Sequence, residues 1–203
     1  MSTHHLFDIL LSYEPLPKKL LDKDFVENLK NYLIPILATS VYTKRQLLLS
    51  AGQLAEYIYF MEEGFARGFY MHPQTKKEIT HFLWNRDSII TVPDSFYKQT
   101  PSYLFIEVMP QTQLIALSYD QLMACKKVYP ITEIFSRNVI LQYNAYEAKR
   151  NYDMASLSAW ERYLRLLQTH PDIEQQVSKE VIASYLDITP QSLSRMLKEK
   201  RHP

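Results

Sequence analysis

The hydrophobic pattern of the chain changes its period along the sequence. Over residues 25–37 the apolar positions have helical spacing and predict one short helix. Over 38–118 short apolar and aromatic runs alternate with turn residues, as where the run 57–61 is followed by Glu62-Glu63-Gly64. Short strands separated by a turn about every ten residues predict an antiparallel sandwich or barrel.

Beyond these strands the pattern is helical. It predicts helices over 119–129 and 159–168, the second opened by a capping box of Ser158 and Glu161. Between them lies a long helix over 131–153, whose apolar positions run along much of one side: Ile131, Ile134, Phe135, Val139, Leu141, Ala145 and Ala148. Either the barrel's own surface or the same helix of a second subunit could cover this stripe, and we expect a two-fold dimer.

The segment 178–200 predicts two short helices joined by a tight turn. Ser178 is expected to cap the first helix, and Thr189 with Pro190 to open the second. Asp187 falls in the turn at a position that usually has left-handed backbone, which aspartate tolerates better than most residues. Two helices crossing over so short a turn form a helix-turn-helix, a fold element that reads DNA.

The second helix of this pair is amphipathic, with Leu193, Met196 and Leu197 expected inside. On its outer face Arg195 suits guanine and Gln191 suits adenine, because each side chain can bond bidentately to that base. Four basic residues and one acidic residue lie between positions 189 and 203, which concentrates positive charge there. The expected DNA-binding residues are Thr189, Gln191, Ser192, Ser194, Arg195, Lys198, Lys200 and Arg201.

Composition narrows the class of protein. The chain has 203 residues, enough for one large or two small domains, and its net charge of +1 does not indicate a partner. Cys125 is the only cysteine, which excludes an intramolecular disulfide and fits a reducing compartment; we expect a buried structural thiol. The first eleven residues lack the features of a signal peptide, and no apolar run approaches about 18 residues. We therefore expect a cytoplasmic protein with no membrane span.

Five motifs, in this order and spacing, resemble the cyclic-AMP receptor protein/fumarate-nitrate regulator (Crp/Fnr) superfamily of bacterial transcription regulators over nearly the full length. They occupy residues 44–52, 57–67, 77–83, 158–163 and 182–195.

The resemblance implies an α+β chain in three parts. An N-terminal antiparallel β-roll of the cyclic-nucleotide-binding jelly-roll type spans 1–130, a dimerisation helix 131–153, and a winged-helix-type helix-turn-helix 154–203. The implied function is a dimeric regulator that binds double-stranded DNA at a palindromic site through recognition helix 190–200. RNA polymerase and a small-molecule effector are further candidate partners. The sequence ends at Pro203, directly after the recognition helix, so little or no wing is expected.

The effector is where the chain departs from the family pattern. Members that bind cyclic AMP hold it with a glycine, a glutamate and an arginine followed by a small hydroxyl residue. The corresponding stretch 84–98 has no glycine, no glutamate and no such pair. We therefore expect no cofactor and no response to cyclic AMP, while a different effector, or none, stays open. The candidate effector pocket comprises Phe82, Trp84, Arg86, Ser88 and Phe96, although aromatic residues here are more often core.

Two other classes of function are alternatives to a transcription regulator. A cupin-like small-barrel enzyme needs two or three histidines and a carboxylate on one face, and neither His72 nor His81 has a second histidine at such spacing. No catalytic or metal site is therefore expected. The other alternative is an interaction module whose helix-turn-helix no longer touches DNA.

Overall fold

The computed structural model describes residues 3–201, except for the side chains of His4 and Arg201. The chain begins with α1 (Thr3–Leu11) and α2 (Lys23–Leu33), each followed by a 3₁₀ turn, Lys18–Leu21 and Ile34–Ile36. The Asp22 carboxylate caps α2 by accepting the backbone N–H groups of Asp24 and Phe25. The helix predicted over 25–37 is therefore α2 with its terminal turn, whereas α1 had not been predicted.

A β-sandwich follows, as the strand pattern predicts. Its strands are β1 (Ala38–Tyr42), β2 (Gln46–Leu49), β3 (Tyr57–Glu63), β4 (Ala66–Met71), β5 (Glu78–Trp84), β6 (Ile89–Ile90), β7 (Phe105–Val108) and β8 (Thr112–Ser118). They form two four-stranded sheets, ordered β1-β8-β3-β6 and β2-β7-β4-β5, and every pair is antiparallel.

Gly64 shows why the β3–β4 turn needs glycine. Its φ is +101°, and a Cβ atom there would lie 2.5 Å from the Cα atom of Thr112. The Thr112 hydroxyl in turn accepts the Phe65 amide at 3.2 Å and donates to the Met109 carbonyl at 2.8 Å. Backbone from two hairpins thus meets at a point where no side chain fits.

Helices make up the rest of the chain. They are α3 (Pro93–Lys98), α4 (Tyr119–Val128), α5 (Glu133–Ser156), α6 (Ala159–Thr169), α7 (Ile173–Gln176), α8 (Lys179–Tyr185) and α9 (Pro190–Arg201). The capping box of Ser158 and Glu161 at the start of α6 is present as predicted. Two short helices had not been predicted, because α3 lies within the predicted strand region and α7 lies between the helix predicted over 159–168 and the segment 178–200.

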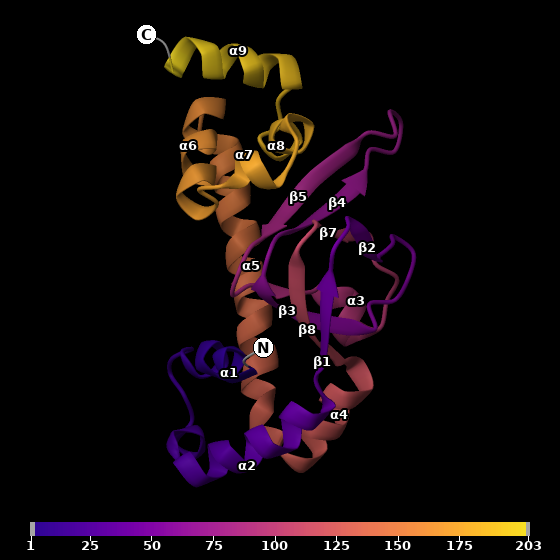
Figure 1. Ribbon diagram of the computed structural model, residues 1–203, viewed down its shortest axis with the longest axis vertical. Coiled ribbons are helices and arrows are strands. Elements are labelled where there is room, and N and C mark those ends of the chain that lie inside the picture. Colours follow the sequence, from indigo (N-terminus) through magenta and orange to yellow (C-terminus); the bar gives the residue numbers. More distant parts are fainter. Residues whose placement is uncertain (1–2, 202–203) are drawn as a thin grey trace.

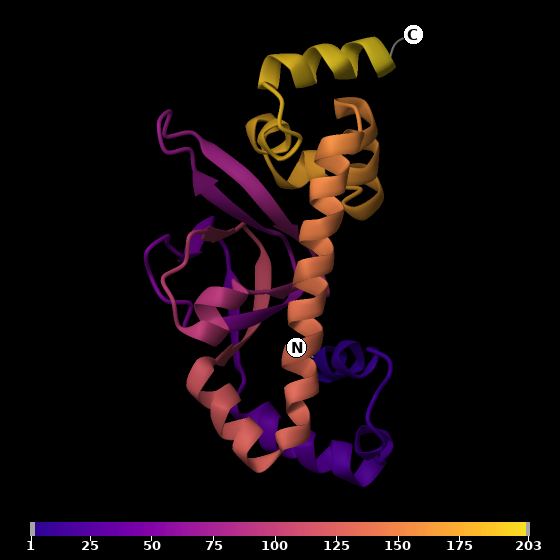
Figure 2. The same cartoon turned by 180° about the vertical axis from the view of Figure 1, so that it is seen from behind.

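Figures 1 and 2 show how these parts are arranged. The long α5 runs along the outside of the sandwich and carries the C-terminal helices at one end, with α9 farthest from the sandwich. The β4–β5 hairpin reaches up beside α8. The apolar core of the C-terminal helices includes Phe65, Leu83 and Met109 of the sandwich, so the two parts share a buried boundary. Cys125 is fully buried in a separate cluster near α2, as expected.

Candidate DNA interface and interdomain cavity

The predicted helix-turn-helix is formed by α8 and α9. Asp187 has a φ of +53°, the left-handed conformation expected at this point. Its amide donates to the Ser184 carbonyl at 3.2 Å, and the Ile188 amide donates to the Ala183 carbonyl at 3.0 Å. The turn therefore forms without glycine, because aspartate accepts this conformation at modest cost.

The two helices start differently. The Thr189 hydroxyl accepts the Ser192 amide at 3.1 Å, so the cap predicted for α9 is confirmed. Ser178 occupies the N-cap position of α8 but makes no side-chain capping bond, so the prediction of a serine cap is wrong. Its side chain instead bonds to the Glu180 carboxylate, and this hydrogen bond lowers the pKa of Glu180. The polar partner of Ser178 is the neighbouring carboxylate, which competes with the backbone.

Packing fixes the angle between α8 and α9. Ala183 of α8 and Leu193 of α9 are completely buried, and Leu193 had been predicted to face inward. The other apolar side chains of this core are the buried Ile182, Leu186 and Leu197, with the partly buried Ile188 and Met196 against them. The orientation of α9 is therefore set by an apolar core beneath it.

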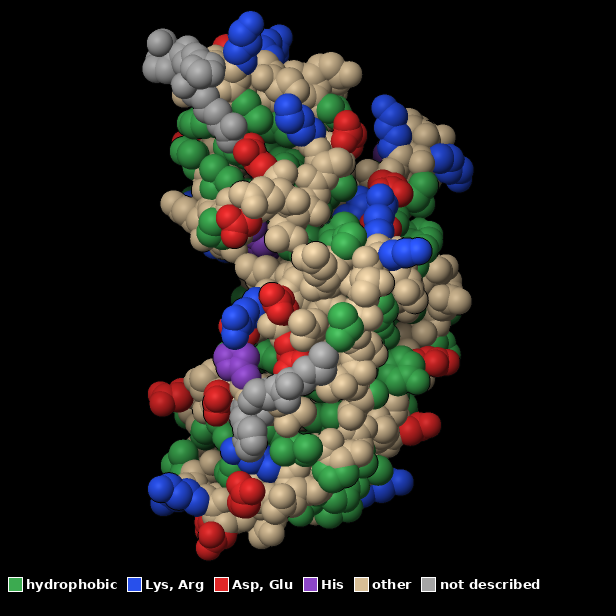
Figure 3. Space-filling view, viewed as in Figure 1, with side chains coloured by type: hydrophobic (Ala, Val, Ile, Leu, Met, Phe, Trp, Pro, Cys, Tyr) green, Lys and Arg blue, Asp and Glu red, His purple; other side chains and the backbone are tan. Residues whose placement is uncertain are grey.

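The outer face of α9 is polar and exposed. The residues predicted to contact DNA that are exposed are Thr189, Gln191, Ser194, Arg195, Lys198 and Lys200. Ser192 is half-buried, and its hydroxyl accepts a hydrogen bond from the Thr189 hydroxyl at 3.0 Å. Arg201 ends α9, but its side chain lies outside the described part of the structure. Figure 3 shows Lys and Arg side chains gathered over α9.

The β4–β5 turn adds a second basic patch that the sequence reading missed. Lys76 and Lys77 are exposed at this turn, and Figure 3 shows blue side chains at the hairpin tip beside the C-terminal helices. In the sequence this patch is visible only as two neighbouring lysines in a polar loop. Only the fold reveals that this loop lies near α8.

The opposite side of the helix-turn-helix is bonded to the sandwich. The Ser184 hydroxyl accepts the Thr80 amide at 2.9 Å and donates to the Glu78 carbonyl at 3.0 Å. From α5, the Arg150 guanidinium donates to the carbonyls of Thr80, at 3.3 Å, and Tyr185, at 2.9 Å. These bonds join β5, α5 and α8 at one point, which we call the domain junction.

Beside this junction lies a hollow between the two parts of the molecule, here called the interdomain cavity. It has a volume of about 360 Å³ and is lined by β5, the loop to β6, α5, α6 and α8. Phe82, Trp84 and Ser88 of the expected effector pocket line it. Arg86 does not line it, since its side chain is 69% exposed on the loop. Phe96 is fully buried in the sandwich core instead.

Aromatic stacking fills the sandwich side of the cavity. The Phe82 ring stacks on Trp84 at 5.2 Å, on Tyr143 at 5.0 Å and on Tyr146 at 4.9 Å between centroids. In the stretch 84–98 the buried side chains are mainly apolar, and no basic side chain is buried. Most of the buried side chains of this stretch therefore belong to the sandwich core, and Trp84 also lines the cavity.

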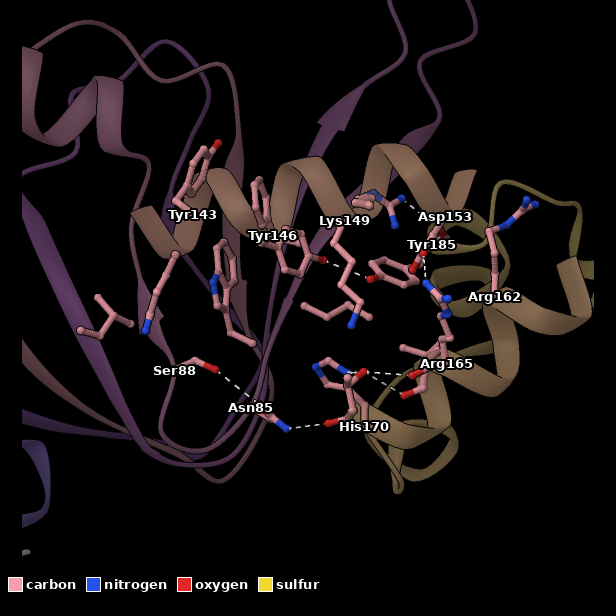
Figure 4. Close-up of a pocket in the computed structure, with 18 of the residues that line it drawn as sticks. Asn85, Ser88, Tyr143, Tyr146, Lys149, Asp153, Arg162, Arg165, His170 and Tyr185 are labelled. Atoms are coloured by element: carbon pink, nitrogen blue, oxygen red, sulfur yellow. Dashed lines mark hydrogen bonds and ion pairs between the residues drawn. The ribbon is translucent and has the colours of Figure 1, made fainter. Parts of the chain in front are cut away.

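His170 forms part of the cavity wall at the end of α6 (Figure 4). Burial lowers the pKa of its imidazole to about 4, an effect that the nearby Leu83 carbonyl partly offsets. The ring is therefore neutral at physiological pH, because burial disfavours its charged form.

Helix α5 has a second, exposed face. Along it the residues Leu141, Ala145, Ala148, Tyr152 and Ala155 follow one another at alternating steps of four and three, and all are exposed. Leu141 is 52% and Tyr152 61% exposed. At about 100° per residue, these positions lie opposite Val139 and Tyr146, which pack against the sandwich.

Comparison with solved structures identifies this architecture. A regulator from Eubacterium rectale, assigned to the Crp/Fnr family, matches with a TM-score of 0.69 and 14% identity, covering 86% of this chain and 82% of its own. This is the fold of the Crp/Fnr regulators. The Xanthomonas campestris global regulator CLP matches at 0.66 and 14%, covering 86% and 91%. The Thermus thermophilus catabolite activator protein matches at 0.53 and 18%, covering 94% and 87%.

These comparisons confirm the predicted α+β fold, with its β-roll, long helix and C-terminal helix-turn-helix. No protein-family model matches the sequence, and no curated protein matches it. Within residues 3–201, no three or more His, Cys, Asp or Glu side chains are grouped as a metal site would require. Over the same residues, no helix combines the length and apolar character needed to cross a membrane.

Proposed function

We propose that this chain is a dimeric, sequence-specific DNA-binding regulator of transcription that acts in the cytoplasm. The observation that carries the proposal is the outer face of α9, where Gln191 and Arg195 are exposed above a fully buried helix-turn-helix core. A recognition helix needs this combination, because its side chains must reach base edges while its axis is held rigidly.

The contacts are assigned by chemistry. Arg195 pairs with guanine and Gln191 with adenine in the major groove. The phosphate and sugar contacts, which fix position without reading sequence, come from Thr189, Ser192, Ser194, Lys198, Lys200 and Arg201. The exposed Lys76 and Lys77 of the β4–β5 turn supply further attraction to the DNA backbone.

The dimer forms through α5. Its exposed stripe from Leu141 to Ala155 has the spacing of a coiled-coil seam, and a second copy related by a two-fold axis would cover it. Two recognition helices are then presented to two half-sites, so the operator is a palindrome. RNA polymerase is the partner through which such a regulator would act.

Cyclic AMP is not the effector in this proposal. The protein named CLP is described as responsive to c-di-GMP, so nucleotide response occurs on this fold. Here, however, the stretch 84–98 offers no glycine, glutamate or buried arginine to hold a cyclic phosphate, and Phe96 fills the core. Calorimetry with cyclic AMP is expected to show no binding at micromolar concentration, and a micromolar dissociation constant would overturn this part.

Genomic footprinting tests the proposal as a whole. Protection of palindromic sites is expected, and absence of protected sites would refute DNA reading. The salt dependence of DNA affinity separates a regulator from an interaction module that does not touch DNA. Affinity that depends on several phosphate contacts falls about tenfold or more as the salt concentration rises.

Light scattering tests the dimer directly. The wild-type chain is expected at twice its monomer mass, and the double variant Leu141→Glu/Ala148→Glu at the monomer mass. Asn151→Glu places the same charge on an exposed flank of α5 and serves as the control. A monomeric wild type, or a dimer in the double variant, would contradict dimerisation through this stripe.

A further inference from the structure

The interdomain cavity has the size and position of a small-molecule site. Its volume of about 360 Å³ falls in the range of ligand sites, about 300–1,000 Å³, which commonly lie between domains. Figure 3 shows the outline of the molecule hollowed between its upper and lower parts. Figure 4 shows side chains from the sandwich, from α5 and from α6 directed into this space.

The charge of the lining favours an anion. Four cationic side chains, Lys149, Arg150, Arg162 and Arg165, face two carboxylates, Asp87 and Asp153. Asp153 is paired with Arg165, while Asp87 contacts His5 and Arg86 outside the cavity. Each carboxylate therefore already has a basic side chain beside it.

Lys149 is the cation that remains available. Arg150 donates to the Thr80 and Tyr185 carbonyls, and Arg162 to the carbonyls of Leu157 and Leu186. Lys149 makes no hydrogen bond or ion pair with any described residue, and Figure 4 shows its ammonium group pointing into the space before His170. Lys149 is also exposed, so its ammonium group can be reached from solvent, and such a group is suited to an anionic oxygen.

One wall of the cavity is aromatic. Trp84, Tyr143 and Tyr146 line the cavity around the stacked Phe82 ring. Aromatic faces of this kind favour a planar ligand, which can stack on them with little loss of conformational freedom.

The cavity is bounded by bonds that join the two parts of the molecule. On one side the Asn85 side chain donates to the Thr169 carbonyl at 3.0 Å. On the other, the hydroxyl groups of Tyr146 and Tyr185 lie 3.1 Å apart, next to the Arg150 contact. A ligand that touches both walls favours the domain arrangement in which these bonds are made, and so biases the direction of α9.

We propose that the interdomain cavity binds a small planar organic anion, held by Lys149 and stacked on the aromatic wall, and that its occupancy sets the orientation of the helix-turn-helix. The regulatory consequence rests on the proposed DNA-binding function, whereas the site itself does not. Aromatic carboxylates and nucleotide phosphates share this chemistry.

Titration of the full chain with 1-anilinonaphthalene-8-sulfonate, a fluorescent anion with a planar naphthalene ring, tests the site without DNA. Saturable binding is expected, and Lys149→Gln should weaken it about tenfold or more, the loss of one charge-assisted hydrogen bond. Lys149→Arg should restore most of the affinity. Lys127→Gln removes an exposed lysine of α4, away from the cavity, and should leave affinity unchanged. No binding to the wild type, or equal binding by Lys149→Gln, would overturn the site.

Competition identifies the class of anion. Displacement of the probe by benzoate but not by AMP assigns a carboxylate, and the reverse assigns a nucleotide phosphate. Either result supports an anion site. Displacement by neutral benzamide as effective as by benzoate would overturn the role of charge.

Hydrogen exchange tests the coupling, again without DNA. Binding of the probe should slow amide exchange in segments 78–84 and 182–188, on the two sides of the domain junction, by about threefold or more. The Lys149→Gln variant should show no such protection at the same probe concentration. Unchanged exchange in a saturated wild type would overturn coupling while leaving the site intact. Failure of DNA binding would leave both measurements unaffected.

Discussion

The two sides of the C-terminal helical region differ in what holds them. On the outer side of α9, Gln191 and Arg195 are exposed, and their side chains make no hydrogen bond or ion pair with any other residue that the structure describes. On the inner side, Ser184 and Tyr185 of α8 are hydrogen-bonded to β5 and α5, and the apolar core beneath α9 continues into the sandwich. The outer side is accessible to a binding partner, while the inner side fixes the position and orientation of that binding surface.

This difference separates stability from recognition. Substitutions on the inner side should act on folding or on domain orientation, because they remove buried contacts. Substitutions on the outer side should act on DNA affinity and leave folding unchanged, except at Thr189, whose hydroxyl also caps α9. Each prediction below tests one side against the other.

The largest effect is expected beneath α9. Leu193→Ala should lower the free energy of unfolding by about 2–5 kcal/mol, because its side chain is completely buried and truncation leaves a cavity. Urea denaturation measures the change. Leu164→Ala in α6 removes a leucine that is 41% exposed and should cost about 0.5 kcal/mol or less. Similar losses for both variants would contradict the assignment of Leu193 to the core.

A pH-dependent effect is expected from His170 on the inner side. Its pKa is lowered from 6.5 to about 4 by burial, so between these values the unfolded chain binds more protons than the folded chain. The stability that this contributes is fully present above about pH 6.5 and is lost as the pH falls toward 4. At about 1.4 kcal/mol for each pKa unit, the loss is at most about 3.5 kcal/mol.

Urea denaturation at pH 7 and pH 5 measures this dependence. His170→Gln should reduce the fall in stability between the two values, because its amide does not titrate. The same substitution at His72, in the β4–β5 turn, controls for the removal of a histidine. An unchanged pH dependence in His170→Gln would show that burial does not hold this imidazole neutral.

The sequence predicts the outer side of the C-terminal helical region better than the inner side. The helix-turn-helix, its left-handed Asp187 and the outward Arg195 follow from local periodicity and turn chemistry, which the sequence displays directly. The domain junction does not, because Thr80 and Ser184 are separated by 104 residues and both are ordinary polar residues. The interdomain cavity was not predicted. Phe82 and Trp84 had been assigned to a candidate effector pocket, but Lys149 and His170 come from other elements that only the fold brings together with them.

On the outer side, Arg195→Ala should weaken binding to the natural operator by about 1–3 kcal/mol, because a bidentate contact to a base is lost. The free energy of unfolding should stay within about 0.5 kcal/mol of the wild type. Electrophoretic shift assays measure the affinity. Arg86→Ala removes another exposed arginine, on the loop after β5, and should leave the affinity unchanged. Equal affinity of Arg195→Ala and the wild type would refute base reading by Arg195.

The smallest changes in stability are expected at the N-cap residues of α8 and α9. Thr189→Ala should cost about 1 kcal/mol of stability, since its hydroxyl accepts the Ser192 amide at the start of α9. Ser178→Ala should cost only a few tenths of a kcal/mol, because Ser178 makes no capping bond and its partner is the exposed Glu180. Thermal denaturation of both variants provides the test.

Thr189→Ala should also weaken DNA binding beyond its effect on folding, since fraying of the first turn displaces Gln191. Ser178→Ala should bind DNA as the wild type does. Equal stability losses in Thr189→Ala and Ser178→Ala would contradict the observed difference in capping hydrogen bonds. They would indicate that both side chains cap their helices, as the sequence predicts.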